Sequence, residues 1–224
     1  ASRRLLLAAP SVLGSTRRTG PYAHRLVAAW RSHPSVELVT AIDTALTLLA
    51  DHELATSTLG VRIAASVRAT PYVAFAAGLA SMEGVLHGSA SAEAYELLRG
   101  CAASDPDQVI AQRRADRQPI PGFGHKVYRN ADPRFTPLLD VVRRLDVALG
   151  HDIAGVVDAT VAEVGRLMPH PPNVDLALGA LMLTADLDPT APIFAVARIA
   201  GWGAHYAEEV AERPLRFRGV ATPR

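Results

Sequence analysis

A histidine lies among glycines and basic residues in PGFGHKVYRNADPR, residues 121–134. The two glycines allow the backbone around His125 conformations that other residues rarely adopt, and imidazole can exchange a proton near neutral pH. Arg134 falls in the first turn of the helix expected to follow, where the helix dipole disfavours a cation unless an anion binds there. A site for an acidic ligand and an ordinary basic loop capped by Asp132 are both compatible with this pattern.

A second histidine, His87, lies in EGVLHGSAS, where an apolar helix gives way to small residues and the start of another helix. Small residues would let a ligand approach the backbone, and the free N–H groups at a helix start can bind an anion. A histidine that caps the end of a helix, favoured by the helix dipole, explains the pattern equally well.

Two charged residues, Asp175 and Arg198, lie in otherwise apolar helical stretches. Buried charges are costly unless they are paired. The two residues could therefore pair with each other. Alternatively, each could act on a substrate, with Asp175 as a base and Arg198 as a ligand for a carboxylate.

The elements that would position these residues are helical. Apolar residues recur three and four apart over 35–67, a spacing typical of helices, and Pro71 suits the first turn of a helix over 71–86. Further helices are predicted over 92–100, 106–116, 133–150, 153–168, 174–187 and 191–212. Gly100 is expected to end the first of these, and Asp132 and Asn173 are expected to cap the helices that begin at 133 and 174. Alternating strand patterns are nearly absent, so we predict an all-α fold.

The composition limits the classes of partner. The 224 residues suit one medium domain or two small ones,. With 23 basic and 22 acidic residues, the net charge of +1 gives no reason to expect a nucleic-acid surface,. No apolar run approaches the roughly 20 residues of a membrane-spanning helix. A single cysteine, Cys101, excludes an internal disulfide and fits a reducing compartment, so we expect a cytoplasmic protein,.

Residues 1–36 contain six arginines and no acidic residue, a composition found in organelle transit peptides. A short helix, a basic loop and a second helix would have the same composition. We favour this second interpretation because helical patterning continues directly after it.

Several of these stretches together resemble the citrate synthase family. GFGHKVYRNADPR, residues 122–134, resembles the family signature of Gly-Phe-Gly-His, a hydrophobic pair and Asp-Pro-Arg. ADHELATST, GLASMEGVLHG, PNVD, FAVARIAGWGAHYAEE and the Arg-Pro pair at 213–214 also occur in the family's order. The resemblance extends from about residue 5 to 219. It implies that the N-terminal stretch is an internal part of the family's larger domain and not a presequence.

The resemblance implies a citrate-synthase-like, two-domain helical fold. Residues 1–87 and 191–224 would be the remainder of the large domain, including helices of a homodimer interface, and residues 88–190 would be the small domain. Family members carry a long N-terminal portion that this sequence lacks. We therefore expect either a missing N-terminal segment, a partner chain or a shortened homologue.

The resemblance also implies roles for the charged residues. His87 would hydrogen-bond the thioester carbonyl of acetyl-CoA while Asp175 removes a methyl proton. His125 would donate to the ketone of oxaloacetate as the new carbon–carbon bond forms. Hydrolysis of citryl-CoA then gives citrate and CoA, with no metal and no permanently bound cofactor.

Binding residues follow from the same resemblance. Those expected to bind the carboxylates of oxaloacetate and citrate are His52, Arg134 and Arg198, with Arg213 contributed by the neighbouring subunit. Those expected to contact CoA are Gly122, Phe123, Gly124 and Lys126.

The chain departs from the family at a few positions. Gly88-Ser89-Ala90-Ser91 follows His87, where the family usually has Gly-Gly-Ala and often Asn next, and Leu176 replaces a usual aromatic residue. A 2-methylcitrate synthase that uses propionyl-CoA shares the catalytic residues, so the motifs do not separate the two substrates. The sequence is also compatible with a non-catalytic homologue that binds CoA or a tricarboxylate, and with an enzyme that cleaves citryl-CoA on the same site.

Overall fold

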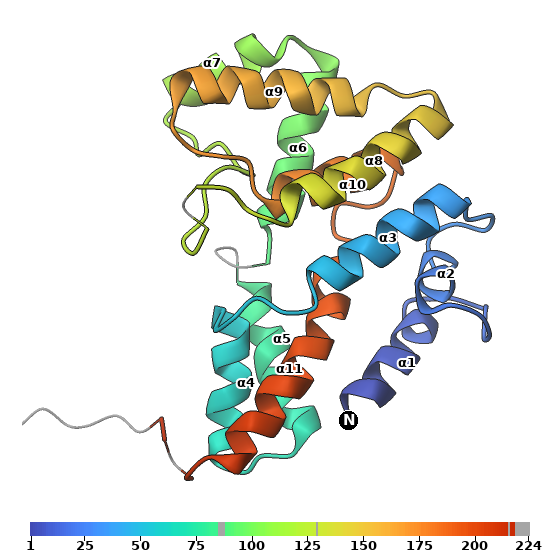
Figure 1. The fold of residues 1–224 in the computed structure, drawn as a ribbon, viewed down its shortest axis with the longest axis vertical. Coiled ribbons are helices and arrows are strands. Elements are labelled where there is room, and N and C mark those ends of the chain that lie inside the picture. The colour runs from blue at the N-terminus through green and yellow to red at the C-terminus, as the bar shows by residue number, and fades with distance from the viewer. Residues whose placement is uncertain (85–87, 129, 215, 218–224) are drawn as a thin grey trace, which may run out of the picture.

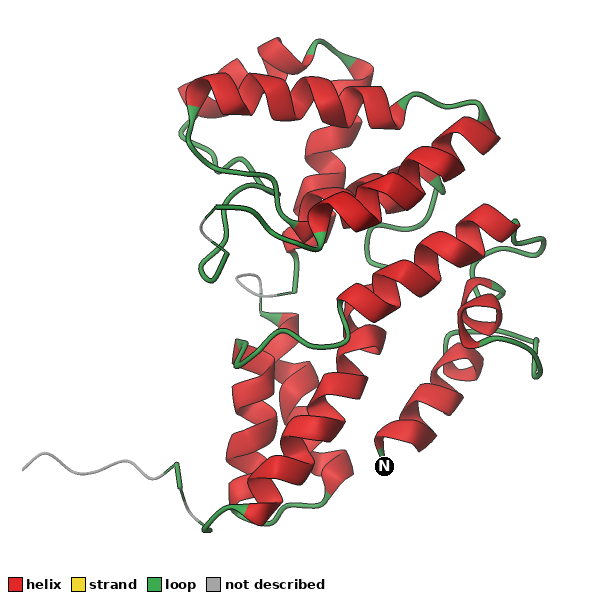
Figure 2. Ribbon diagram, viewed as in Figure 1, coloured by secondary structure: helices red, strands yellow, loops and turns green. Residues whose placement is uncertain are grey.

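Eleven α-helices form the regular structure of the part of the chain that the computed structural model describes. The described residues are 1–84, 88–128, 130–214 and 216–217. The helices are α1 Ser2–Val12, α2 Tyr22–Val27, α3 Val36–Leu48, α4 Thr56–Ser66, α5 Pro71–Glu83, α6 Ala90–Ala103, α7 Pro106–Ala115, α8 Phe135–Leu149, α9 Ile153–Leu167, α10 Val174–Thr184 and α11 Ile193–Ala211. Loops connect them, with one isolated antiparallel bridge between Phe123 and Pro172 (Figure 2). The predicted all-α fold class is confirmed.

The helices form an upper and a lower group, with α3 between them (Figure 1). Helices α6 to α10 make up the upper group, whereas α4, α5 and α11 pack together in the lower group. One hydrophobic core runs from α2 and α3 through α8 to α10, and a smaller core surrounds Trp202 between α4, α5 and α11. The division into a small domain at 88–190 and a large-domain remainder at 1–87 and 191–224 stays a prediction.

Local sequence signals account for many helix ends. Pro71 opens α5, the Asn173 side chain accepts a hydrogen bond from the Asp175 N–H group at the start of α10, and Gly150 ends α8 in the left-handed conformation,. Helices α1 and α2, joined by a basic loop, agree with the favoured interpretation of residues 1–36. None of the described helices combines the length and hydropathy that crossing a bilayer requires.

The helix predicted to end at Gly100 continues to Ala103. Cys101 is buried with Leu97 and Ile110 in a small core between α6, α7 and α9. Burial of Cys101 stabilises the helix by more than glycine's intrinsic helix preference disfavours it,.

The prediction that α8 begins at Pro133 with Asp132 as its cap is wrong by two residues. Helix α8 begins at Phe135, and residues 133–134 form a turn. The Asp132 carboxylate accepts a hydrogen bond from the Arg134 N–H group, two residues on. This local bond stabilises a turn ahead of the helix.

A loop divides the helical pattern of residues 35–67 into α3 and α4, and α11 fixes this loop in place. The carbonyl groups of Leu49 and Ala50 accept hydrogen bonds from Arg198 Nε and the Gly201 N–H group, at 3.1 and 3.0 Å. The His205 ring lies 3.1 Å from Asp51 Oδ1. A Cβ atom at position 201 would lie 2.4 Å from the Ala50 carbonyl oxygen, so this contact needs glycine.

We predict that Gly201→Ala displaces this loop and lowers the free energy of unfolding by about 1–3 kcal/mol, the usual effect of overpacking a protein interior. Urea denaturation followed by circular dichroism would measure the change. Gly165→Ala in α9 is the matched control, because a Cβ atom there meets nothing within 4 Å and alanine favours helix by about 1 kcal/mol. Equal destabilisation of both variants would contradict the prediction.

Candidate active site

A cavity of about 740 Å³ brings five separate segments of the chain together. They are the loop that precedes α4, the start of α6, the His125 loop, the start of α10 and the first half of α11. The predicted site residues that line the cavity are His52, Gly124, His125, Lys126, Arg134, Asp175 and Arg198. His87 lies outside the described residues, although Ala90 at the start of α6 also lines the cavity.

The glycine-rich stretch 122–124 pairs with the residues that precede α10, next to the site. The Gly122 carbonyl accepts from the Asn173 N–H group at 2.9 Å, and the Asn173 side chain donates to the Gly124 carbonyl at 2.7 Å. Gly122 and Phe123 contribute to this pairing and are not among the cavity-lining residues, in contrast to Gly124.

His125 is held as a hydrogen-bond donor. Its Nδ1 atom accepts hydrogen bonds from the N–H groups of Val127 and Tyr128, both at 3.0 Å. A nitrogen that accepts cannot carry the proton, so the neutral ring is protonated on Nε2. Burial and the nearby charge of Arg134 lower the pKa of His125. Arg134 Nη2 also lies 3.4 Å from Nε2, but the two shorter bonds to Nδ1 at 3.0 Å determine the tautomer, so Nε2–H can be donated to a ligand in the cavity.

Arg134 already has a carboxylate partner. Its Nε and Nη2 atoms donate to the two oxygens of Asp132 at 2.9 and 2.8 Å. Burial acts to raise the pKa of Asp132, but hydrogen bonds from Arg134 and from the Val174 N–H group lower it overall. Because Asp132 compensates the cation near the start of α8, the helix dipole alone no longer requires a bound anion.

Arg198 is a buried cation whose pairing is incomplete. Its side chain is fully buried, and Nε donates to the Leu49 carbonyl, but Nη1 and Nη2 have no hydrogen-bond partner within the described part of the chain. The guanidinium carbon lies 4.7 Å from the centre of the Phe194 ring. Burial lowers the pKa of Arg198 to about 10, so the group is still charged at pH 7. Two free donors on a buried cation are suited to a carboxylate ligand.

The alternative pairing of Asp175 with Arg198 does not form among the described residues. Asp175 lies in the first turn of α10, and its Oδ1 atom accepts a hydrogen bond from the Ser91 hydroxyl at 2.7 Å. Burial raises the pKa of Asp175, while the Ser91 hydrogen bond and the charge of Arg134 oppose the rise. The site therefore presents a carboxylate with increased proton affinity, the property expected of a general base.

His52 is a neutral ring in contact with His125. Their ring centres are 4.8 Å apart, and Tyr128 packs against both rings. Burial, together with the charges of Arg134, His125 and Arg198, lowers the pKa of His52 to about 4. The ring is therefore uncharged at pH 7, and it can donate a hydrogen bond to an anion without carrying charge itself.

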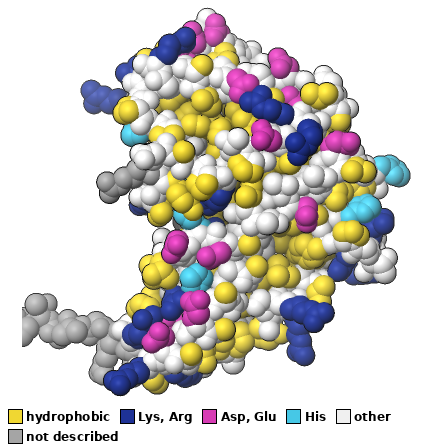
Figure 3. Space-filling model, in the orientation of Figure 1, with side chains coloured by type: hydrophobic (Ala, Val, Ile, Leu, Met, Phe, Trp, Pro, Cys, Tyr) yellow, Lys and Arg dark blue, Asp and Glu magenta, His cyan; other side chains and the backbone are white. Residues whose placement is uncertain are grey.

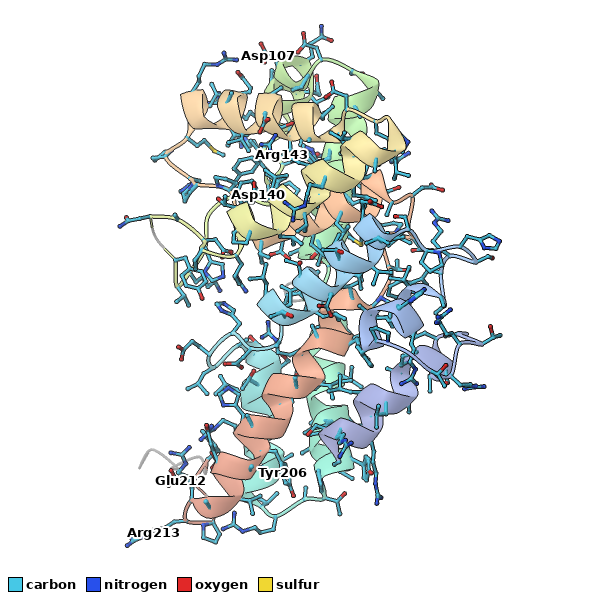
Figure 4. All side chains as sticks on the ribbon, turned by 45° about the vertical axis from the view of Figure 1, so that its right-hand side comes forward. Asp107, Asp140, Arg143, Tyr206, Glu212 and Arg213 are labelled. Atoms are coloured by element: carbon cyan, nitrogen blue, oxygen red, sulfur yellow. The ribbon has the colours of Figure 1, made fainter. Side chains whose placement is uncertain are left out.

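Arg213 lies away from this cavity. It is exposed beyond the end of α11, near Glu212 at the lower end of the molecule (Figure 4). Arg198 lies near the other end of the same helix, roughly 20 Å away at 1.5 Å per residue. Within one subunit, the structure does not bring Arg213 to the predicted site.

Sequence reasoning did not predict the roles of Ser91 and Asp132. In the sequence, Ser91 stands out only as a departure from the family, and Asp132 only as a cap. Ser91 contacts Asp175 and Asp132 contacts Val174, each pair being distant in sequence. The spacing of residues along the chain does not indicate such contacts. Among the described residues, His, Cys, Asp and Glu side chains form no group that could hold a metal ion.

Comparisons with known proteins agree with these motifs. The family model for the C-terminal domain of citrate synthase matches residues 8–218. A citrate synthase from Synechocystis sp. is 35% identical over 175 residues, which are 75% of this chain and 44% of the relative. A 2-methylcitrate synthase from Mycobacterium tuberculosis is 27% identical over 186 residues, 81% of this chain and 47% of the relative. The chain thus spans about half the length of the curated relatives it matches.

A solved structure extends the comparison to the fold. Citryl-CoA lyase from Hydrogenobacter thermophilus superposes with a TM-score of 0.80 and 23% identity, over 96% of this chain and 88% of that chain. At this identity the similarity concerns the fold alone. Because the family model covers almost all of the sequence, from residue 8 to 218, the chain belongs to the citrate synthase family.

Proposed function

We propose that this chain forms the catalytic part of an enzyme that condenses acetyl-CoA with oxaloacetate to give citrate and CoA. One observation carries the proposal. Asp175, His125 and Arg198 come from three separate segments and line one cavity, where burial raises the pKa of Asp175 and lowers that of His125, and Arg198 keeps two nitrogens free for a ligand.

The reaction begins with removal of a proton from the methyl carbon of the thioester. Asp175 takes this proton, and the electron pair of the C–H bond becomes the enolate whose charge rests on the thioester oxygen. A methyl proton next to a thioester is only weakly acidic, so a base with increased proton affinity supports the transfer. The family resemblance assigns stabilisation of the enolate oxygen to His87, which lies outside the described residues.

The enolate carbon then attacks the ketone carbon of oxaloacetate. The ketone oxygen becomes an alkoxide and takes the proton from Nε2 of His125, the nitrogen that the backbone contacts leave protonated. Water then attacks the thioester carbonyl of citryl-CoA and the C–S bond breaks. One proton of the water goes to the CoA thiolate, the other restores Nε2–H of His125, and Asp175 releases the methyl proton to solvent. Hydrogen-bond donors fixed before the reaction stabilise the developing charge at little reorganisation cost.

The cations of the cavity would hold the substrate carboxylates. Arg198 offers two free nitrogens, Arg134 adds positive charge beside His125, and neutral His52 can donate one hydrogen bond. Lys126 and Gly124 line the cavity and, together with the adjacent Gly122 and Phe123, are assigned to CoA. Arg213 is assigned to the site of a neighbouring subunit.

Propionyl-CoA is the alternative acyl donor. A relative named 2-methylcitrate synthase matches most of this chain, and the same base and donors would serve either acyl group. Parallel assays with the two thioesters would distinguish the reactions by their kcat/KM values.

We predict that Asp175→Ala and His125→Ala each lower the release of CoA thiol from acetyl-CoA and oxaloacetate by at least about 100-fold, as removal of a general acid or base does. A thiol-reactive dye would follow the release. The matched control is Asp140→Ala, which removes an exposed carboxylate of α8 (Figure 4) and is expected to keep wild-type rates. Equal rates for wild type and both site variants would contradict the proposal, and binding without any turnover would favour a non-catalytic homologue.

We predict that Arg198→Met abolishes the rise in Tm that citrate produces in the wild-type protein. Without citrate, its stability should stay within about 1 kcal/mol of wild type, because loss of one hydrogen bond is offset by removal of an incompletely paired buried charge. Differential scanning fluorimetry would measure both effects. Arg143→Met, at an exposed ion pair with Asp158, should keep the citrate response. A full response in Arg198→Met would contradict its assignment.

We also propose that α4 and α5 take part in a dimer interface. Both expose hydrophobic side chains, including Ile63, Tyr72 and Val73. On the face shown in Figure 3, Lys and Arg side chains are scattered among hydrophobic and acidic ones. A surface of this composition fits a protein partner better than a polyanion.

Val73→Glu is expected to convert the dimer into a monomer, because a charge buried without a partner destabilises an interface. Light scattering after size exclusion would give the mass. Val147→Glu is the control, since Val147 is 81% exposed on α8, away from α4 and α5. A wild-type monomer, or a dimer that persists in Val73→Glu, would contradict this assignment.

A further inference from the structure

We propose that Ser91 is a positioning residue for the base. Its hydroxyl holds Oδ1 of Asp175, so that the carboxylate keeps one orientation and Oδ2 serves as the proton acceptor. The inference rests on the proposed function, since it assigns a task to a residue that touches the base and lies outside the set of cavity-lining residues.

The contact is short and enclosed. The Ser91 hydroxyl lies 2.7 Å from Asp175 Oδ1, and Ser91 is only 9% exposed. Both residues lie in the first turn of their helices, Ser91 in α6 and Asp175 in α10. N-terminal turns stabilise a negative charge, so the carboxylate lies where two helix starts meet.

Close packing of the two helices brings the pair together. One helical turn beyond the pair, Gly179 of α10 lies against Ala94 and Tyr95 of α6, and a Cβ atom at position 179 would lie 2.7 Å from the Tyr95 backbone nitrogen. Residues three and four apart share a helix face. Ser91 therefore shares a face of α6 with Ala94 and Tyr95, and Asp175 shares a face of α10 with Gly179. The close approach at Gly179 thus determines the distance between hydroxyl and carboxylate.

The hydroxyl also affects the charge state of the base. Burial raises the pKa of Asp175, and the hydrogen bond from Ser91 opposes this rise. The other described groups whose charges act on Asp175 are Arg134 and His125, which lower its pKa, and Asp132, which raises it. Arg198 also interacts with Asp175 electrostatically across the cavity. Among these groups, Ser91 alone donates a hydrogen bond to the carboxylate.

Loss of the Ser91 hydroxyl should therefore raise the pKa of Asp175. A hydrogen bond to a charged group contributes enough that its loss corresponds to a rise of about one pH unit. The carboxylate is the active form, so the acidic limb of kcat/KM should move to higher pH by the same amount. Loss of orientation should lower kcat by about tenfold at the optimum pH, since a misplaced catalytic group reduces the rate. KM for oxaloacetate should not change, because Ser91 does not touch the carboxylate-binding residues.

The test compares wild type with Ser91→Ala and Ser91→Thr. Proteins labelled with ¹³C at aspartate carboxyl carbons would be titrated by NMR, with the Asp175 signal assigned through its loss in Asp175→Asn. We expect Ser91→Ala to titrate about one pH unit above wild type and Ser91→Thr to restore the wild-type value, because threonine retains the hydroxyl. Ser66→Ala is the matched control, since Ser66 is also buried, on α4, and its hydroxyl donates to the Ile63 carbonyl.

The titration does not depend on turnover, so it separates the inference from the proposed function. If wild type releases no thiol, the proposed function fails while the NMR titration still tests the Ser91 contact. If wild type is active and Ser91→Ala shows the wild-type titration and pH profile, the inference is overturned. A shift in Ser66→Ala equal to that in Ser91→Ala would overturn it as well, because the effect would then reflect general loss of a buried hydroxyl.

Discussion

Asp132 lies where the His125 loop, α8 and α10 meet, and its two oxygens accept four hydrogen bonds. Two come from the Arg134 guanidinium, one from the Arg134 N–H group and one from the Val174 N–H group. The Val174 bond connects the loop to α10, which carries Asp175, and the guanidinium bonds keep Arg134 beside His125. The positions of the loop and of the base therefore depend on one buried carboxylate. In other proteins, removing one member of such a buried network lowers the free energy of unfolding by several kcal/mol.

Next to Asp132, the cavity contains charged groups that do not neutralise each other fully. Arg198 is buried with two free nitrogens, while His52 and His125 stay neutral because burial and nearby cations lower their pKa values. Incompletely paired buried charge disfavours the folded state, and a ligand with carboxylates would offset this cost,. The arrangement is typical of functional sites, where perturbed titratable groups cluster.

Close contacts through glycine set the distances between the elements of the site. Gly201 lets the loop that carries His52 lie against α11, and Gly179 lets α6 and α10 approach until Ser91 reaches Asp175. The sequence shows that glycines are present in these helices, but not which backbone each one meets. Helix α6 shows this limit of sequence-based prediction. Gly100 predicts the end of the helix, but burial of Cys101 extends the helix beyond it.

The sequence by itself determined the helical class, several helix starts and the family, because periodicity, caps and ordered motifs are local properties of the chain. It also indicated residues such as His125, Asp175 and Arg198, whose types are unusual in their surroundings. Only the tertiary structure decided that Arg134 is paired with Asp132, that Arg198 has free donors and that Ser91 contacts the base. These properties depend on contacts between distant segments and on burial, which changes both hydrogen bonding and pKa.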